Sequence, residues 1–414
     1  MEINLLKYNR HWEKGYVYPY QKTRNLFTDI INSLNNKFIV ELIGLRRVGK
    51  STLLYQTINY LIKEKKVDPY KIIYFTFDEK QPSIEDLLNF FSTQTQIDFK
   101  KEKILVFLDE VQKLSNFQNQ IKIYYDLYPN IKFFISGSTS LFIKKKTQES
   151  LAGRIVSYLL KPLSFLEYLN FKDKTELLDK PLLYKKDLEN EFNNFLNSQF
   201  IESIYLSKIQ ERKEYFRSIV KKIIYEDLPG VLSFDNPQIL FSIVEYLAQY
   251  PGAVINFINL SRDLKISNKT LSLYFSYLED SFLIKKLYNF SRNLISSEKK
   301  LKKYYLASPS FSFSLVDFVS NGNLFENYFA SQTSSSYFWR DVYKNEVDFI
   351  AVDKQKNIVP MEVKYKTEIN STDIKNLLLF MKKYQVRKGE VYYLGAEKKL
   401  VQRDGKIINL IFSK

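Results

Sequence analysis

The sequence predicts an α/β protein with a parallel sheet near its amino terminus, followed by a helical region and a second α/β region. Three observations lead to this expectation. Between Phe38 and Ser136, four short apolar runs (FIVELIG, KIIYFTF, KILVFLD and IKFFISG) alternate with helical stretches. This alternation is typical of strands buried on both faces of a parallel sheet. From about Pro162 to Tyr250 the pattern is helical and charged, and from about Ser308 strands return, mixed with helices.

The composition limits the available chemistry. The chain has 414 residues, of which 45% are hydrophobic and 26% charged, which predicts several folded domains. It contains no Cys and one His, so disulfides, iron–sulfur clusters, Cys-based zinc sites, thiol nucleophiles and multi-His metal centres are excluded. A Ser–His mechanism would have to use His11. What remains is chemistry with carboxylates, Lys, Arg, hydroxyls, backbone amides and hard cations such as Mg²⁺.

The chain is basic. Its 62 Lys and Arg exceed its 46 Asp and Glu, which gives a net charge of +16. Such a balance suits nucleic acid or nucleotide phosphates as partners, although a general bias of the chain toward Lys, Ile, Asn and Tyr explains it equally well. No apolar run is long enough to cross a membrane, and the first residues lack the pattern of a secretory signal. We therefore expect a cytoplasmic protein without a membrane span.

The first apolar run ends in a phosphate-binding loop. Residues 44–51 read GLRRVGKS and match G-x-x-x-x-G-K-[ST] between a strand and the helical stretch TLLYQTINYLIK. Glycine allows the backbone to approach phosphate closely, and the loop amides with the helix amino terminus would cradle the β-phosphate. Lys50 would neutralise β/γ oxygens, and the Ser51 hydroxyl would bind Mg²⁺. The predicted nucleotide-binding residues are Gly44, Arg47, Val48, Gly49, Lys50, Ser51 and Thr52.

Two later strands are predicted to complete this site. The run ILVFL ends in Asp109 and Glu110. Asp109 would hold Mg²⁺, mostly through water, and Glu110 would act as the general base on the attacking water; an acidic helix cap is the alternative. The run IKFFIS leads into residues 137–140, GSTS, where we expect Ser138 or Thr139 to orient the water. An ordinary turn or helix cap explains these residues equally well.

These stretches, together with Leu151-Ala-Gly-Arg154 and the KPLSF that begins at Lys161, resemble a large group of prokaryotic, archaeal-type AAA+ ATPases. The resemblance spans roughly residues 20–170. It implies Walker A, Walker B and sensor 1 functions at the residues named above, with ATP and Mg²⁺ as cofactors and a homo-oligomer as one possible assembly. It also suggests Arg154 as a conformational or γ-phosphate-sensing arginine, acting in its own subunit or across an interface. A surface turn or a structural salt bridge is the alternative for this arginine.

A helix-turn-helix pattern follows the helical region. Residues 254–293 read as two short helices and a turn, and the later runs FLIKKL and KYYL could form a wing, which is typical of a winged helix. Such a domain would contact DNA phosphates or the groove through exposed polar residues of the turn, the second helix and the wing. A packing module or a protein interface is the alternative. The candidate DNA-contacting residues are Lys265, Asn268, Lys269, Ser272 and Lys286.

A carboxylate–lysine group lies near the carboxyl terminus. Glu362 and Lys364 are two apart on a predicted strand, so their side chains share one face, and Asp348 lies on the preceding strand. This Asp…Glu-x-Lys arrangement is typical of metal-dependent nucleases. Asp348 and Glu362 would bind Mg²⁺, and Lys364 would position or deprotonate the attacking water. A nuclease-like fold without cleavage activity, or a solvated charged hairpin, is the alternative.

The spacing resembles the PD-(D/E)xK nuclease fold, and the order of domains resembles the carboxyl-terminal half commonly joined to the AAA+ group, whose function is generally not established. The resemblance implies that Glu326, on the preceding helix, supplies a further metal ligand. One departure is that Val347 stands where such nucleases often have Pro before the first Asp.

The predicted fold is thus a P-loop AAA+ core with a parallel sheet, a helical lid, a winged helix and an α/β restriction-endonuclease-like domain. The predicted function is Mg²⁺-dependent ATP hydrolysis that couples nucleotide state to DNA binding or processing. The alternative is a regulatory ATPase switch that binds a protein or nucleic-acid partner without cleavage. The predicted boundaries are 1–35 for an amino-terminal lead-in, 36–160 for the core, 161–250 for the lid, 251–307 for the winged helix and 308–414 for the nuclease-like domain.

Overall fold

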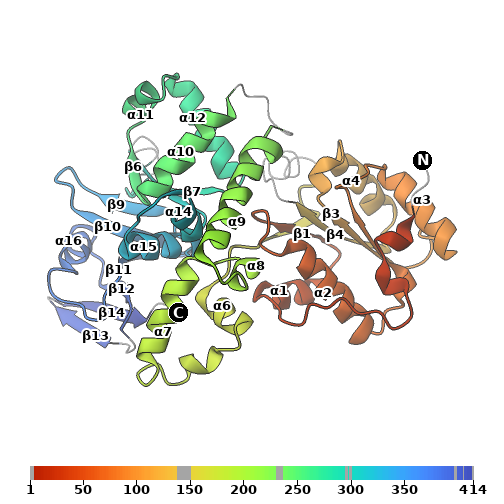
Figure 1. The fold of residues 1–414 in the computed structure, drawn as a ribbon, viewed down its shortest axis with the longest axis horizontal. Coiled ribbons are helices and arrows are strands. Elements are labelled where there is room, and N and C mark those ends of the chain that lie inside the picture. Colours follow the sequence, from red (N-terminus) through yellow and green to blue (C-terminus); the bar gives the residue numbers. More distant parts are fainter. Residues whose placement is uncertain are drawn as a thin grey trace. The chain divides into compact units, whose positions relative to one another are not determined.

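The computed structural model describes residues 4–137, 151–229, 236–293, 297, 301–395, 399–403 and 405–412. The chain divides into two compact units, Met1–Leu160 (unit 1) and Lys161–Lys414 (unit 2), whose elements are labelled in Figure 1. Within the described ranges, no helix has both the length and the apolar character that crossing a membrane requires.

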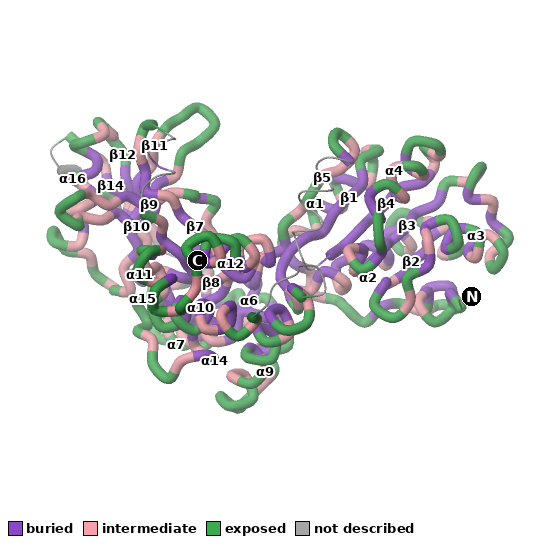
Figure 2. Tube along the Cα trace, turned by 90° about the horizontal axis from the view of Figure 1, so that it is seen from above, coloured by how far each residue is buried: buried purple, intermediate pink, exposed green. Residues whose placement is uncertain are grey.

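Unit 1 is built around a five-stranded sheet in the order β2-β3-β4-β1-β5, and every neighbouring pair is parallel. This confirms the predicted α/β fold class with a parallel sheet. The central strands are buried along their whole length, as their continuous apolar runs require, and Figure 2 shows them in purple. The strands are β1 (Ile39–Ile43), β2 (Ile72–Thr76), β3 (Ile104–Asp109), β4 (Ile131–Gly137) and β5 (Ile155–Leu159). The helices are α1 (Leu26–Asn32), α2 (Lys50–Lys63), α3 (Ile84–Thr95) and α4 (Phe117–Leu127), with short 3-10 turns at Leu5–Lys7, Arg10–Trp12, Ser33–Asn35, Pro69–Lys71 and Val111–Lys113.

The strand order brings three polar strand ends together. β4 lies between β1 and β3, and its register pairs Leu42 with Ser136 on one side and Leu108 with Ile135 on the other. Since the strands are parallel, the loop after β1, the end of β3 and the end of β4 all lie at the carboxyl edge of the sheet.

The amino-terminal residues belong to unit 1 rather than forming a separate segment. The buried Asn9 side chain donates to the Tyr74 carbonyl (3.0 Å) and accepts from the Tyr74 amide (2.6 Å). β2 is the edge strand, so Asn9 satisfies backbone groups that would otherwise be unpaired. The helix α1 begins at Leu26, within this amino-terminal part of unit 1.

Unit 2 contains a nine-stranded mixed sheet in the order β13-β14-β12-β11-β10-β9-β7-β8-β6. Its strands are β6 (Ala253–Ile255), β7 (Ile284–Asn289), β8 (Lys302–Leu306), β9 (Tyr337–Arg340), β10 (Glu346–Val352), β11 (Ile358–Lys364), β12 (Lys388–Tyr393), β13 (Lys399–Arg403) and β14 (Lys406–Phe412). Its helices are α6 (Phe165–Phe171), α7 (Lys185–Leu196), α8 (Ile201–Ile204), α9 (Ile209–Lys222), α10 (Pro237–Gln249), α11 (Phe257–Asp263), α12 (Asn268–Asp280), α14 (Pro309–Leu315), α15 (Asn321–Gln332) and α16 (Lys375–Tyr384), with a 3-10 turn at Thr175–Leu178 and a π-helical turn at Ile223–Asp227.

The structure groups the carboxyl-terminal segments differently from the predicted boundaries. β6, β7 and β8, from the segment 251–307 expected to form a winged helix, are antiparallel neighbours. β7 then pairs in parallel with β9, which belongs to the segment 308–414. One sheet therefore runs through both segments, and hydrogen bonds across the β7–β9 pair join them.

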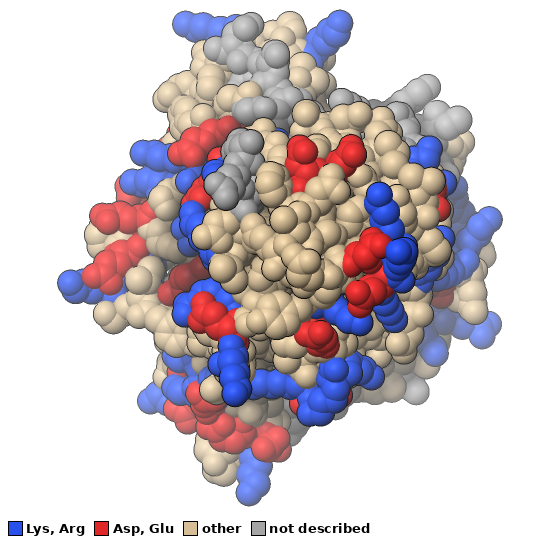
Figure 3. Space-filling view, turned by 90° about the vertical axis from the view of Figure 1, so that its right-hand side faces the viewer, with Lys and Arg blue, Asp and Glu red and all other residues tan. Residues whose placement is uncertain are grey.

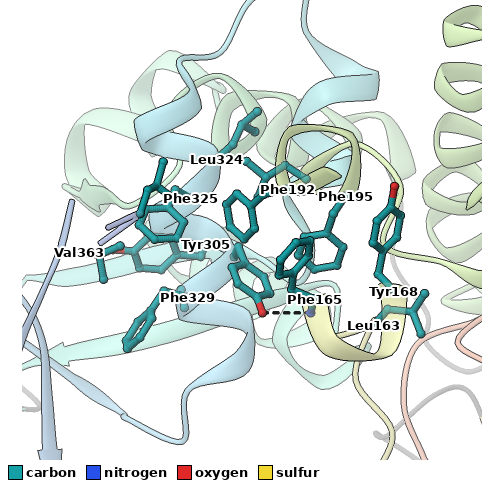
Figure 4. Packing of buried hydrophobic residues seen from close by; sticks show 14 of the residues in the cluster. Leu163, Phe165, Tyr168, Phe192, Phe195, Tyr305, Leu324, Phe325, Phe329 and Val363 are labelled. Carbon is teal, nitrogen blue, oxygen red and sulfur yellow. Dashed lines mark hydrogen bonds between the residues drawn. The ribbon is translucent and has the colours of Figure 1, made fainter. Parts of the chain in front are cut away.

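An aromatic core fills unit 2 between α6, α7, α15 and the sheet. Figure 4 shows Phe165, Phe192, Phe195 and Phe325 packed together, and the Phe165 amide donates to the Tyr328 hydroxyl (3.2 Å). A second cluster packs α16 against strands β9, β10, β12 and β14. The strands are therefore covered by helices, which buries the charged residues that they carry near their ends.

Candidate functional site

The loop after β1 has the backbone that close approach to phosphate requires. Gly44 has φ = 150°, and a Cβ there would lie 2.3 Å from the Leu160 carbonyl oxygen. Gly49 has φ = 98° and begins α2, whose first turn has no side-chain cap in the described chain. The buried Lys50 folds back onto the loop, where Nζ donates to the carbonyls of Gly44 (3.1 Å) and Leu45 (2.9 Å). The loop therefore presents an ammonium group and helix amides at one place.

Asp109 is held by four hydrogen-bond donors. Its Oδ2 accepts from Ser51 Oγ (2.5 Å) and from the Tyr74 hydroxyl (2.9 Å). Its Oδ1 accepts from Ser136 Oγ and from the Glu110 amide (3.1 Å). The side chain is 3% exposed. Because both oxygens are engaged from different strands, the carboxylate is fixed in orientation at the edge of the sheet.

Tyr74 and Ser136 are contacts that the sequence analysis missed. Each is a hydroxyl residue in an otherwise apolar strand run, which was the available signal. Burial, with the Asp109 carboxylate beside it, raises the pKa of Tyr74 well above its ordinary value, so the phenol remains a donor. The predicted water-orienting residues Ser138 and Thr139 lie outside the described residues.

Glu110 follows Asp109 in a left-handed backbone conformation, with φ = 53°. Its Oε2 accepts a hydrogen bond from the Gln112 side chain. A non-glycine residue in this region carries strain that the surrounding structure must hold in place. The turn points the Glu110 backbone amide to Asp109 and leaves its carboxylate next to a side-chain amide, an arrangement compatible with a general base.

The remaining predicted loop residues support the site less directly. Arg47 has φ = 68°, and Thr52 lies in the first turn of α2. The Val48 side chain is 2% exposed, and its carbonyl accepts from the Arg24 guanidinium (2.8 Å). Arg24 thus ties the amino-terminal segment to the loop, a link that the motif alone does not reveal.

The residues present fit Mg²⁺ with a bound nucleotide. The Ser51 hydroxyl and the Asp109 carboxylate are oxygen donors, they already meet at 2.5 Å, and hard cations prefer such ligands. The glycine cradle, which a Cβ at Gly44 would fill, lies directly before them.

Arg154 lies at the opposite edge of the sheet from the loop. Ile155, which follows it, pairs with Ile39 at the start of β1, whereas the loop begins after Ile43. The Arg154 guanidinium forms two hydrogen bonds to Asp126 of α4 (2.8 and 3.0 Å). Within its own chain, Arg154 therefore forms a salt bridge with Asp126. This geometry gives no support to a contact between Arg154 and the γ-phosphate in the same subunit.

The carboxyl-terminal group is partly assembled as predicted. The register of β10 and β11 pairs Phe349 with Met361, so Asp348 and Glu362 are cross-strand neighbours. Lys364 Nζ lies 2.5 Å from Glu362 Oε2 and 3.6 Å from Asp348 Oδ2. The structure therefore brings together the two carboxylates and the lysine of the Asp…Glu-x-Lys pattern.

Glu326, the further metal ligand that the resemblance implies, is paired with a lysine and a tyrosine in this structure. Its Oε1 accepts from Lys303 Nζ (2.8 Å) and from the Tyr305 hydroxyl (2.5 Å). Among the residues that the structure describes, no three Asp, Glu, His or Cys side chains are placed to hold a metal ion. The physical reason is that β8 belongs to the same sheet and carries a lysine into the cluster.

The charges in this cluster shift one another. Burial, together with Asp348, raises the pKa of Glu362 well above its ordinary value. Burial alone would raise the pKa of Asp348, but the Lys364 and Lys303 ammonium groups lower it. Burial would lower the pKa of Lys303, but the surrounding acidic groups raise it well above its usual range. Both lysines therefore remain charged.

The predicted DNA-contacting residues fall into two groups. Lys286 is paired with Glu279 (2.7 Å), and the Asn268 side chain accepts from Ser261 (2.7 Å), so both make contacts inside unit 2. The others are exposed on α12 or in the turn before it, where a partner could reach them: Lys265, Lys269 and Ser272.

Comparison with protein families finds an AAA domain that spans most of unit 1 and the first residues of unit 2. Residues 36–169 match the family described as AAA domain. Residues 200–320 and 318–411 match two families, each described as a Domain of unknown function (DUF8612 and DUF4143). The glycine-containing loop of residues 44–51 and Asp109 both lie inside the AAA match.

The chain is also similar to uncharacterized proteins of archaea and bacteria. One, from Methanocaldococcus jannaschii, is 27% identical over 318 residues, which span 69% of this chain and 64% of that protein. Another, from Haemophilus influenzae, is 25% identical over 379 residues, which span 87% and 91%. Among solved structures, Thermotoga maritima RuvB is 17% identical with a TM-score of 0.29, over 60% of this chain and 81% of that one. AMPPCP-bound DnaA from Aquifex aeolicus is 14% identical with a TM-score of 0.30, over 65% and 92%.

Proposed function

We propose that unit 1 binds ATP with Mg²⁺ and hydrolyses it, and that the nucleotide state controls how unit 2 binds DNA. The single observation that carries the ATPase proposal is the meeting of Lys50, Ser51 and Asp109 at one edge of the sheet. The AAA domain match over residues 36–169 supports it.

Each residue has a distinct task in this proposal. Lys50 exchanges the carbonyls that it contacts in this structure for phosphate oxygens. Ser51 and Asp109 supply the oxygen ligands for Mg²⁺, which neutralises charge on the β/γ oxygens when it is bound. Glu110 takes the proton of the attacking water, and Gln112 holds its carboxylate in place.

ATP turnover by the full chain tests the ATPase proposal. We expect Lys50→Ala to lose ATP binding, and Glu110→Gln to retain binding while losing turnover. Lys63→Ala, at the exposed end of the same helix, is the matched control and should behave as wild type. Turnover that survives in Glu110→Gln would remove this residue from the mechanism, and a wild-type chain without turnover would contradict the proposal.

The DNA part of the proposal rests on exposed basic residues around α12. On the face that Figure 3 shows, basic and acidic side chains are interspersed rather than gathered by sign, so this face carries no patch of one charge. Lys265 lies just before α12 and Lys269 lies in its first turn. In a helix-turn-helix arrangement, the second helix is the one that enters the major groove of DNA. We expect DNA to stimulate ATP turnover, and Lys265→Ala/Lys269→Ala to lose the stimulation. Lys354→Ala/Lys356→Ala, in the exposed turn between β10 and β11, is the control of equal charge.

A protein partner is the second candidate, and exposed apolar residues on the same helices favour it. Ile258 on α11 is 67% exposed, and Leu273 on α12 is 45% exposed. In this case the chain is a regulatory ATPase switch without cleavage. DNA-independent turnover, together with a partner whose binding is lost in Leu273→Asp, would favour this function over DNA binding.

A further inference from the structure

A buried lysine occupies the centre of the carboxylate cluster in unit 2. Lys303 of β8 is 4% exposed. Its Nζ lies 2.8 Å from Glu326 of α15 and 2.7 Å from Glu346 of β10. Glu346 also lies 3.7 Å from the Arg340 guanidinium. Carboxylates from two separate elements therefore converge on one ammonium group.

The backbone around Lys303 leaves room for its side chain. Gly252 has φ = 77°, and a Cβ at this position would lie 2.9 Å from Lys303 Cε and 2.9 Å from the Tyr305 ring. The Tyr305 hydroxyl donates to the same Glu326 oxygen that Lys303 contacts. The end of the lysine stem thus lies against the Gly252 backbone, where a side chain would not fit, so packing as well as charge positions Nζ.

Each carboxylate of the cluster is already paired with a lysine of the chain. Lys303 forms ion pairs with Glu326 and Glu346, and Lys364 forms ion pairs with Glu362 and Asp348. A divalent cation would meet two ammonium groups within the same cluster, which oppose its entry. Hard cations also need several oxygen ligands at short distance, whereas an ammonium group is held by longer hydrogen bonds. Among the described residues, no three Asp, Glu, His or Cys side chains are placed to hold a metal ion.

We propose that Lys303 is a built-in cation in the position that a metal ion would need, so that unit 2 takes up no Mg²⁺ in this cluster and does not cleave phosphodiesters through it. The cluster instead ties β8 to α15 and β10 by fixed charge. This inference concerns unit 2 alone and is independent of ATP hydrolysis in unit 1.

Mn²⁺ binding to the full chain tests the proposal. Electron paramagnetic resonance of free Mn²⁺ measures binding directly, and all variants carry Ser51→Ala so that unit 1 contributes little. We expect this parent chain to bind no Mn²⁺ in the cluster. Lys303→Met should gain one Mn²⁺ site that binds at least about tenfold more tightly than any binding detected in the parent, because Glu326 and Glu346 lose the ammonium group that they share. Lys302→Met, the neighbour on the same strand, is the matched control and should gain none.

Two results would overturn the proposal. One is an Mn²⁺ bound by the parent chain and lost on Asp348→Asn, which would show a working metal site beside Lys303. The other is a folded Lys303→Met chain that still binds no Mn²⁺, which would show that the lysine does not stand in a metal position. The parent measurement decides the main claim even where Lys303→Met does not fold.

Discussion

Removal of the Ser136 hydroxyl tests whether the hydrogen bonds around Asp109 matter for catalysis. Ser136→Ala takes away one of four donors to this carboxylate while leaving Lys50, Ser51 and the loop amides in place. A hydrogen bond to a charged group contributes about 1.5–3 kcal/mol. If that energy holds Asp109 in its working orientation, kcat for ATP hydrolysis should fall by about ten- to a hundredfold. ATP affinity should change by less than about threefold, because the phosphate-contacting groups remain.

The chain offers a matched control on the same sheet. Ser157 of β5 donates its hydroxyl to Glu41 of β1, which is likewise buried, but this pair lies away from the loop. Because Ser157 itself is exposed whereas Ser136 is buried, Ser157→Ala should lose at most a similar free energy of unfolding, about 1.5–3 kcal/mol, with kcat unchanged. Urea unfolding and steady-state ATP turnover on both variants separate the two effects. If Ser136→Ala keeps wild-type kcat, or if both variants lose kcat equally, the assignment of Ser136 to the site is wrong.

Three further predictions follow from single residues of unit 1. Gly44→Ala should abolish ATP binding and lower the free energy of unfolding by several kcal/mol, on the order of 3, because its Cβ would meet a carbonyl oxygen. Gly15→Ala is the control: Gly15 has φ = 80° with open space around it, so the change should cost only the backbone strain. An equal loss of stability in both variants would contradict this prediction. His11, the only histidine, is buried, and burial lowers its pKa to about 4. Its contribution to the free energy of unfolding is therefore fully present above about pH 6.5 and is lost as the pH falls toward 4. His11→Gln should thus flatten the loss of stability in that window by up to about 3 kcal/mol, measured by urea unfolding at several pH values; an unchanged profile would exclude His11 as the cause. Arg154→Ala should leave ATP affinity at low protein concentration within about twofold and have little effect on stability, because the ion pair with Asp126 is solvent-exposed. A large loss of affinity in dilute solution would show a contact within its own subunit.

Local sequence patterns predicted much of unit 1. The strand runs, the glycine loop and the acidic pair after β3 are short-range signals, because each depends on residues that are adjacent or a few positions apart. The structure places Lys50, Ser51 and Asp109 together as the spacing suggested. For Arg154 the sequence left γ-phosphate sensing and a structural salt bridge open, because a motif gives the residue but not the edge of the sheet on which it lies.

In unit 2 the sequence indicated which residue types gather but not their partners. Asp348, Glu362 and Lys364 were predictable because alternation along strands fixes the shared face. Lys303 was not, because its strand was assigned to a different domain. The parallel pairing of β7 with β9 merges both segments into one sheet, and no local pattern encodes that pairing.

The sequence by itself determined the elements and the chemistry available to this protein: a parallel sheet, a phosphate loop, hydroxyls, carboxylates and lysines without thiols. Only the tertiary structure decided which groups meet. Ser136 reaches Asp109 across 27 positions, Tyr74 reaches it across 35, and Lys303 reaches Glu326 across 23. Contacts over such separations depend on strand order and register, which are set by the packing of whole sheets rather than by neighbouring residues.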